Sequence, residues 1–439
     1  MDDRGQFAIS MNVRRGRIPT PETTNMTPVV VFKFNKDILN YLQGKEVPVI
    51  YVEDTHDARN FANDMLAYDL QARYKINDLN SLSDVTLVAA QIKADHPEAR
   101  IVISTNEYSQ YPAAIIREAI DEDTNQLATT LTSYDKGLMK HVLSMYDIPV
   151  AKGFPLAGEI ESQIAQICAR IGFPCIVKPR CGMSSQGVAK ICSEEDLDIC
   201  LTSIKDKSGR LDEYLCEEYI DGEEFFVDAI WSEGAPHVFL LGKYAVPMLE
   251  VAHGNGLVIS RYFARSEDES LYDEILRISK IAARACKFDS GISHTEFLVD
   301  KTGFARLGET ATRMGGGPHS ELAKCAIGYS LGELQCRTLL NDLGDVACRN
   351  DPSRTYGYVN LQPVVSGLIE NILSEEELVR FPGVVKITKS LKPGDMFQLR
   401  GSSTWCLCCI VQGKDPVDFN SRISDIVEAF NERLVIKVI

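Results

Sequence analysis

Short β-branched runs alternate with segments of helical periodicity in the first third of the chain, and no other sequence feature limits the fold as strongly. Strands that alternate with helices in this way are typical of a parallel sheet covered by helices. The predicted strands are residues 29–34, 47–52 and 101–104, and the predicted helices are residues 57–75, 83–94 and 112–120. We therefore expect a small parallel α/β domain over residues 29–130, after a loose tail at residues 1–28.

The rest of the chain mixes both kinds of element, so the predicted fold class is α/β with α+β character. Helical spacing and apolar runs predict helices at 133–146, 158–171, 268–286 and 320–341, strands at 175–178 and 188–191, and a hairpin at 292–310. Residues 355–439 combine strands and turns with a last helix near 421–432.

Composition excludes several classes of protein. The chain has 439 residues, of which 45% are hydrophobic and 25% charged, a balance typical of globular proteins with about 100–200 residues per domain. The net charge of −16 opposes wholesale nucleic-acid binding. No apolar run approaches the ~20 residues of a membrane span, and the acidic start lacks the apolar region of a secretory signal. Thirteen cysteines, including Cys406, Cys408 and Cys409, lack zinc spacing and indicate reduced core thiols in the cytoplasm.

Lys178 is the last residue of a predicted strand. The loop that follows is rich in small residues and contains Gly182, Ser184, Ser185 and Gly187. Small residues let backbone N–H groups approach phosphate oxygens, and the lysine supplies a fixed positive charge. The loop is not a P-loop, because no Gly-Lys-Ser/Thr opens a helix here. The competing interpretation is a surface hairpin with one exposed lysine.

The acidic segment 215–228 reads as two strands joined by a bend. Its extended backbone can offer C=O and N–H groups to a flat base and leave a carboxylate to reach ribose hydroxyls. A strand pair with solvated acids is the alternative.

The hairpin at 292–310 carries two glutamates that point to a cation site. With a turn at residues 300–303, Glu296 faces Leu307, and Glu309 then shares the face of Glu296. Such diagonal neighbours lie ~7–8 Å apart, and oxygen ligands of this kind suit Mg²⁺. Two solvated glutamates remain the alternative.

Arg313 follows the hairpin and precedes three glycines at 315–317. An arginine beside such open backbone suits a second anion site, where charge develops on a transferred phosphoryl group.

Taken together and in this order, these segments resemble the ATP-grasp superfamily, and more narrowly its carboxylate–amine ligases, which include L-amino-acid ligases of the dipeptide-synthetase type. The resemblance runs from about Leu131 to Leu340. It implies a Rossmann-like domain at 29–130, a lid at 131–213, a central subdomain at 214–345 and a small C-terminal lobe at 346–439.

The resemblance also implies cofactors and residue roles. ATP and one or two Mg²⁺ ions, with Mn²⁺ as an alternative, are the implied cofactors. The implied nucleotide contacts are Lys136, Lys178, Gly182, Ser184, Ser185, Gly187, Glu217, Glu218, Ile220 and Glu224, and the implied metal ligands are Glu296 and Glu309. The implied catalytic residues are Lys178, Arg313, Glu250 and His253, and the implied substrate contacts are Glu250, His253, Arg313, Gly316 and Gly317. In this pattern Glu250 holds a substrate ammonium, and His253 holds a carboxylate or a developing oxyanion.

One position departs from the family pattern. Many members have asparagine two residues after the second metal-binding glutamate, but this chain has Ala311, which cannot coordinate and weakens a second metal. Amino-acid ligases often carry a small residue there, so the departure favours that subgroup. We interpret His294 and His319 as scaffold residues, because a lone histidine on a strand is more often hydrogen-bonded than functional.

The predicted activity is therefore ATP-dependent amide formation between two amino-acid-like small molecules through an acyl phosphate, with release of ADP and phosphate. The alternatives are another ATP-grasp ligase, of the nucleotide-biosynthesis or carboxylase type, or an ATP-binding regulatory subunit without activity. The pattern predicts no nucleic-acid or membrane partner, and since many members are dimers it admits a homodimer.

Overall fold

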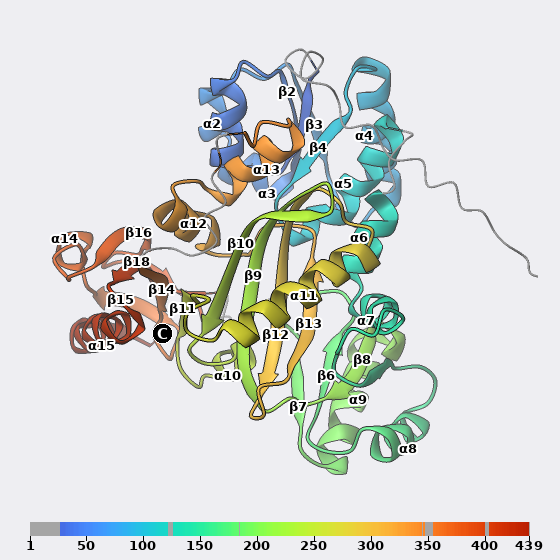
Figure 1. Ribbon diagram of the computed structural model, residues 1–439, viewed down its shortest axis with the longest axis vertical. Coiled ribbons are helices and arrows are strands. Elements are labelled where there is room, and N and C mark those ends of the chain that lie inside the picture. The colour runs from blue at the N-terminus through green and yellow to red at the C-terminus, as the bar shows by residue number, and fades with distance from the viewer. Residues whose placement is uncertain are drawn as a thin grey trace, which may run out of the picture.

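A computed structural model describes residues 27–121, 126–183, 185–344, 346, 354–399 and 404–438. The described residues form four β-sheets (Figure 1). The N-terminal sheet lies at one end of the long central sheet and the lid sheet lies at the other, while the C-terminal elements lie at its side. Among the described residues, no helical segment combines the length and the hydropathy of a membrane span.

The N-terminal sheet is fully parallel, in the order β3-β2-β1-β4, with a hydrophobic core on each face. Its strands are β1 (Val29–Phe32), β2 (Val49–Asp54), β3 (Ala72–Ile76) and β4 (Ile101–Ser104). Its helices are α2 (Lys36–Gly44), α3 (Thr55–Asn60), η1 (Asp64–Ala67), α4 (Leu82–Asp95) and α5 (Glu107–Ile120).

The single helix expected at 57–75 is wrong. Helix α3 ends at Asn60, and strand β3 occupies the end of the predicted range. As an edge strand, β3 is partly exposed and polar, with the sequence ARYKI, so it lacks the β-branched run that marks the inner strands.

The region expected to form the lid, extended by β8, contains an antiparallel sheet in the order β5-β8-β6-β7, and we keep the name lid for it. Its strands are β5 (Gly153–Pro155), β6 (Cys175–Pro179), β7 (Ala189–Ile191) and β8 (Tyr214–Glu218). The helices of this region are α6 (Gln126–Tyr134), α7 (Lys136–Ser144), α8 (Ile160–Arg170), α9 (Glu194–Ser208) and η2 (Leu211–Glu213). The helix expected at 133–146 is divided at Asp135, whose carboxylate caps α7 by accepting from the amides of Gly137 and Leu138.

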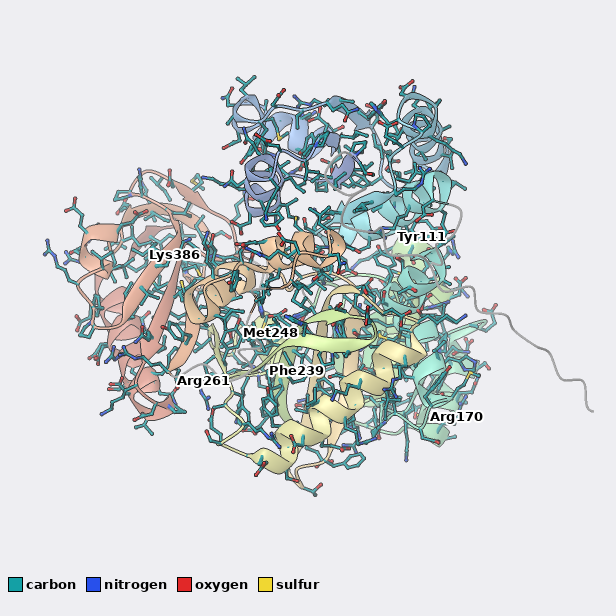
Figure 2. All side chains as sticks on the ribbon, turned by 45° about the horizontal axis from the view of Figure 1, so that its top comes forward. Tyr111, Arg170, Phe239, Met248, Arg261 and Lys386 are labelled. Atoms are coloured by element: carbon teal, nitrogen blue, oxygen red, sulfur yellow. The ribbon has the colours of Figure 1, made fainter. Side chains whose placement is uncertain are left out.

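The central sheet has the order β13-β12-β9-β10-β11-β14-β18-β16 and separates two hydrophobic cores. Helix α11 covers one face, where side chains including Phe239 fill the interface (Figure 2), and α12 and α13 cover part of the other. The strands are β9 (Gly222–Ser232), β10 (Ala235–Tyr244), β11 (Val258–Tyr262), β12 (Gly291–Asp300), β13 (Ala305–Ala311), β14 (Thr355–Leu361), β16 (Val384–Ser390) and β18 (Leu407–Gly413). The helices are α10 (Met248–Ala252), α11 (Glu269–Ala285), α12 (His319–Ile327) and α13 (Leu331–Leu339). The single helix expected at 320–341 breaks at Gly328, whose φ of 87° is left-handed.

The C-terminal elements pack on strands β14 and β18 around a third core. They are β15 (Gly367–Asn371), α14 (Glu375–Leu378), β17 (Met396–Phe397), α15 (Pro416–Arg433) and β19 (Val435–Lys437). Helix α15 begins earlier than expected, because Asp415 caps it and Pro416 fits its first turn. Cys406, Cys408 and Cys409 are buried free thiols in this region, as predicted for core cysteines.

The register predicted for the hairpin of β12 and β13 is wrong. Glu296 lies opposite Glu309, and Leu307 lies opposite Phe297 and faces the core beneath α11. The pairing skips Gly308, which forms a bulge between these two pairs. The bulge lets an apolar residue and a glutamate on the same short strand face opposite sides of the sheet.

Candidate active site

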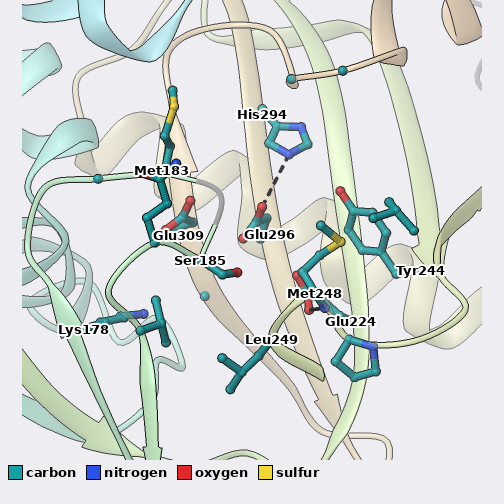
Figure 3. Close-up of a pocket in the computed structure, with 18 of the residues that line it drawn as sticks. Lys178, Met183, Ser185, Glu224, Tyr244, Met248, Leu249, His294, Glu296 and Glu309 are labelled. Atoms are coloured by element: carbon teal, nitrogen blue, oxygen red, sulfur yellow. Dashed lines mark hydrogen bonds and ion pairs between the residues drawn. The ribbon is translucent and has the colours of Figure 1, made fainter. Parts of the chain in front are cut away.

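A cavity of about 500 Å³ lies between the lid, the central sheet and the carboxyl end of the N-terminal sheet (Figure 3). Most of the predicted site residues line it: Lys136, Lys178, Gly182, Ser185, Glu217, Glu218, Ile220, Glu224, Glu250, Glu296, Glu309, Arg313, Gly316 and Gly317. Gly187 and His253 do not line it, and Ser184 lies outside the described residues.

Two lysines share one buried glutamate at the lid side of the cavity. The Nζ atoms of Lys178 and Lys140 lie 2.6 and 2.9 Å from the two carboxylate oxygens of Glu217. Burial alone would raise the pKa of Glu217, but the two ammonium groups hold it below its usual value. Sequence reasoning missed Lys140, although it lies four residues after Lys136, one turn along the same helix face.

Lys136 connects the loop between β6 and β7 to the central sheet. Its Nζ donates to the carbonyl oxygen of Gly182 at 2.8 Å and lies 3.1 Å from a carboxylate oxygen of Glu309. The cap at Asp135, which also binds the guanidinium of Arg180 at 2.6 Å, fixes the start of the helix that carries this lysine.

Three carboxylates, Glu224, Glu296 and Glu309, line the cavity. Glu296 and Glu309 lie opposite each other, and Glu224 on the adjacent strand β9 accepts a hydrogen bond of 2.8 Å from the amide of Met248 (Figure 3). Burial and the neighbouring Glu296 raise the pKa of Glu224 to about 8. Burial opposes ionisation of Glu309 as well, but Lys136 and Lys178 lower its pKa to about 2.

The chemistry of the Glu296–Glu309 pair suits a divalent cation, because the two residues offer carboxylate oxygens from adjacent strands and Mg²⁺ prefers oxygen ligands.

Arg313 contacts the N-terminal domain. Its guanidinium forms a buried ion pair with Glu107 at the start of α5, and its Nη1 donates to the carbonyl oxygen of Met314 at 2.8 Å. Sequence reasoning missed Glu107, although it closely follows strand β4. Ligand sites in such sheets form at the carboxyl ends of the parallel strands. The position of Glu107 just after β4 therefore indicates a site residue.

A chain of polar side chains crosses the face of the central sheet beside the carboxylates. Asp228 is fully buried and binds two imidazoles, with 2.8 Å to Nδ1 of His294 and 2.7 Å to Nδ1 of His319. The Nε2 of His294 lies 3.6 Å from Glu296, and the Nε2 of His319 lies 3.4 Å from the Tyr358 hydroxyl.

The two histidines that we interpreted as scaffold are hydrogen-bonded in this way, and both also line the cavity. Burial alone would lower the pKa of His294, but Asp228 raises it to about 9. Burial opposes the charge on Asp228 too, yet the two imidazoles hold its pKa well below the usual range.

The segment expected to bind amino acids lies at the edge of the cavity. Glu250, on α10, lies 3.5 Å from Nζ of Lys190 and accepts from Asn255 at 3.0 Å. His253 follows α10 and is exposed to solvent. The structure therefore brings Glu250 to the cavity and leaves His253 outside its lining.

Comparison with known proteins agrees with this arrangement. A family model described as an ATP-grasp domain matches residues 171–320. An L-arginine-specific L-amino acid ligase of Bacillus subtilis is 28% identical over 349 residues, which are 76% of this chain and 79% of that protein. A D-alanine–D-alanine ligase of Actinobacillus succinogenes is 30% identical over 221 residues, which are 47% of this chain and 67% of that protein.

A solved structure shows the same fold over nearly the whole chain. The L-amino acid ligase of Bacillus licheniformis superposes with a TM-score of 0.72 and 18% identity, covering 94% of this chain and 99% of that one. The family match, the related ligases and the shared fold agree with one another. The chain therefore belongs to the ATP-grasp family and is a ligase that forms carbon–nitrogen bonds.

Proposed function

We propose that this ligase joins the carboxylate of one amino acid to the amine of another in two steps. The substrate carboxylate first attacks the γ-phosphorus of ATP, which breaks the bond to the β-phosphate oxygen and gives an acyl phosphate and ADP. The amine of the second substrate then attacks the acyl carbon, phosphate leaves with the bonding electron pair, and the amine loses a proton. The L-amino acid ligase and the D-alanine–D-alanine ligases among its relatives support amino acids as the substrates.

The observation that carries this proposal is that two lysines, an arginine and a carboxylate pair face one cavity. We assign Lys136 and Lys178 to the phosphate oxygens, whose charge they would neutralise, and Arg313 to the transferred phosphoryl group. Glu217, Glu218 and Ile220 lie at the lid side, in the region that we assign to adenine, with Glu224 toward the ribose.

Glu296 and Glu309 are the residues that would hold Mg²⁺. One or two such ions, when bound, supply charge neutralisation to the nucleotide phosphates. Ala311 offers no ligand atom, so we assign the protein contribution to these two glutamates.

We further propose that the reaction takes place in the cytoplasm on small molecules. The twelve cysteines within the described residues are all free thiols, which supports a reducing compartment.

The test is amide formation by purified protein with ATP, Mg²⁺ and pairs of amino acids. Replacement of Glu309 by glutamine keeps the shape of the side chain but removes its charge, so we expect product formation to fall about a hundredfold or more. The exposed lid variant Glu161→Gln serves as the control and should match the parent enzyme. Normal turnover by E309Q would exclude the proposed metal role, and ADP release without an amide product would indicate another reaction class.

A further inference from the structure

The cavity extends far beyond the carboxylate pair, toward the C-terminal elements. From β12 the sheet continues through β9, β10 and β11 to β14, four steps of ~4.8 Å and therefore about 19 Å. Each of these strands contributes a lining side chain, in the order Glu296, Glu224, Tyr244, Val258 and Asn360. The half of the cavity away from the lid therefore has room for substrate groups beyond the reacting atoms.

Asn360 marks the far end of this half. Its side chain is 2% exposed, lines the cavity, and carries an amide oxygen with no hydrogen-bond partner within the described part of the chain. Buried polar groups in proteins are almost always hydrogen-bonded, since an unpaired one is costly. The amide of Asn360 is thus a group that a ligand with an N–H or O–H donor would satisfy.

The walls around Asn360 are mostly aromatic or apolar. Val258 pairs directly with Asn360 across β11 and β14, and Tyr358 lies two residues before it on the same face. Trp405 lies at this end of the cavity, beside Gly317. A Cβ added to Gly317 would lie 3.5 Å from the indole ring of Trp405. These surfaces suit the apolar part of a side chain.

No carboxylate comes from the described residues that β10, β11 and β14 contribute to the lining. Both oxygens of the nearby Asp228 are bound by imidazoles, and Glu250 on α10 lies beside Lys190. A cationic side chain at this end would be buried without an opposite charge, which is unfavourable.

We propose that this outer end, walled by Tyr244, Val258, Tyr358, Asn360 and Trp405, receives the side chain of one amino-acid substrate. Asn360 selects an uncharged side chain that ends in a hydrogen-bond donor, with glutamine as the representative. The inference rests on the proposed function and adds the class of substrate.

The test uses side chains of similar length but different chemistry. The catalytic efficiency kcat/KM for amide formation is measured with glutamine, methionine, glutamate and lysine as the varied amino acid. We expect glutamine to exceed the other three about tenfold or more, because only glutamine is uncharged and offers a donor to the amide oxygen.

Variants at Asn360 separate this role from folding. N360L should lower kcat/KM for glutamine about tenfold and leave methionine unchanged or improved, and the nearly isosteric N360D should shift the preference toward lysine. The exposed variant Asn420→Leu on α15 is the control and should match the parent enzyme.

Three outcomes would overturn the inference. A preference for lysine or glutamate in the parent enzyme contradicts an uncharged subsite. Equal losses for glutamine and methionine in N360L, with no shift in N360D, indicate a merely structural residue. The absence of any amide product would overturn the proposed function as well, whereas product formation that ignores Asn360 would overturn the subsite alone.

Discussion

Single residues in the cavity show that burial and partners, rather than residue type, decide the charge of a carboxylate. Glu224 and Glu309 are both buried, yet their pKa values shift in opposite directions. Glu309 has Lys136 beside it, whereas Glu224 has a backbone amide and other carboxylates. The first is therefore charged at neutral pH, and the second carries a proton near neutral pH when no cation is present.

Glu224 should make the metal-free protein less stable as pH rises. Its pKa is near 4.5 in the unfolded chain and about 8 in the folded one, so the folded state binds more protons between these values. Stability from this group is therefore present below about pH 4.5 and is lost as pH rises through 8. In E224Q, the decline in unfolding free energy across this range should be smaller by up to about 1.4 kcal/mol per pH unit. Denaturant unfolding in EDTA at several pH values measures it, and an unchanged slope would contradict the assigned shift.

Asp228 should be important for stability because it binds two imidazoles at once. Its replacement by asparagine removes the charge between His294 and His319, and removing one partner of a buried pair costs about 3 kcal/mol. Chemical unfolding should show a loss of this size for D228N. The exposed variant Asp69→Asn should stay within about 0.5 kcal/mol of the parent protein, and an equal result for both variants would argue against the network.

Helices and strands with a strong local sequence pattern are predicted well. Elements with a weak pattern are not, because tertiary contacts determine their conformation. The inner strands β1, β2 and β4 and helix α11 match the predicted segments closely. The sequence pattern does not predict strand β3, because an edge strand needs no β-branched run. The bulge at Gly308 was missed because a bulge depends on the partner strand.

The turn between β13 and α12 offers a prediction at this scale. A Cβ added to Gly315 would lie 2.8 Å from Nδ1 of His294 and 2.8 Å from Cγ of His319, whereas one added to Gly316 would meet nothing within 4 Å. Gly315→Ala should therefore lower the unfolding free energy by about 1–3 kcal/mol through overpacking. Gly316→Ala is the matched control for stability, and equal unfolding midpoints would contradict the close approach of this turn to the histidines.

The whole molecule assembles the site from parts far apart in the sequence. The lid supplies Lys136 and Lys178, the central sheet supplies the carboxylates, and the N-terminal domain supplies Glu107. The ion pair of Glu107 with Arg313 joins two of these parts across 206 residues of sequence.

Replacement of Glu107 by glutamine should loosen this connection. We expect kcat/KM for the amino-acid substrates to fall about tenfold or more, since Arg313, which we assign to the transferred group, would be misplaced, while ATP affinity stays nearly unchanged. Coupled ADP release and direct nucleotide titration measure the two effects. Glu46→Gln, exposed on the same domain, is the control, and unchanged kcat/KM in E107Q would mean that the ion pair has no part in the reaction.

The fold class and the candidate chemistry could be predicted from the sequence, because short-range patterns and the resemblance to a known family point to both. Periodicity marks strands and helices, and a lysine before a glycine-rich loop or a glutamate on each arm of a hairpin is readable locally. Which groups meet depends on tertiary contacts: Lys140 meets Glu217, Glu107 meets Arg313, and the two histidines meet Asp228. These pairings join separate elements, so no local pattern encodes them, and the charge of each group follows from its partners and burial.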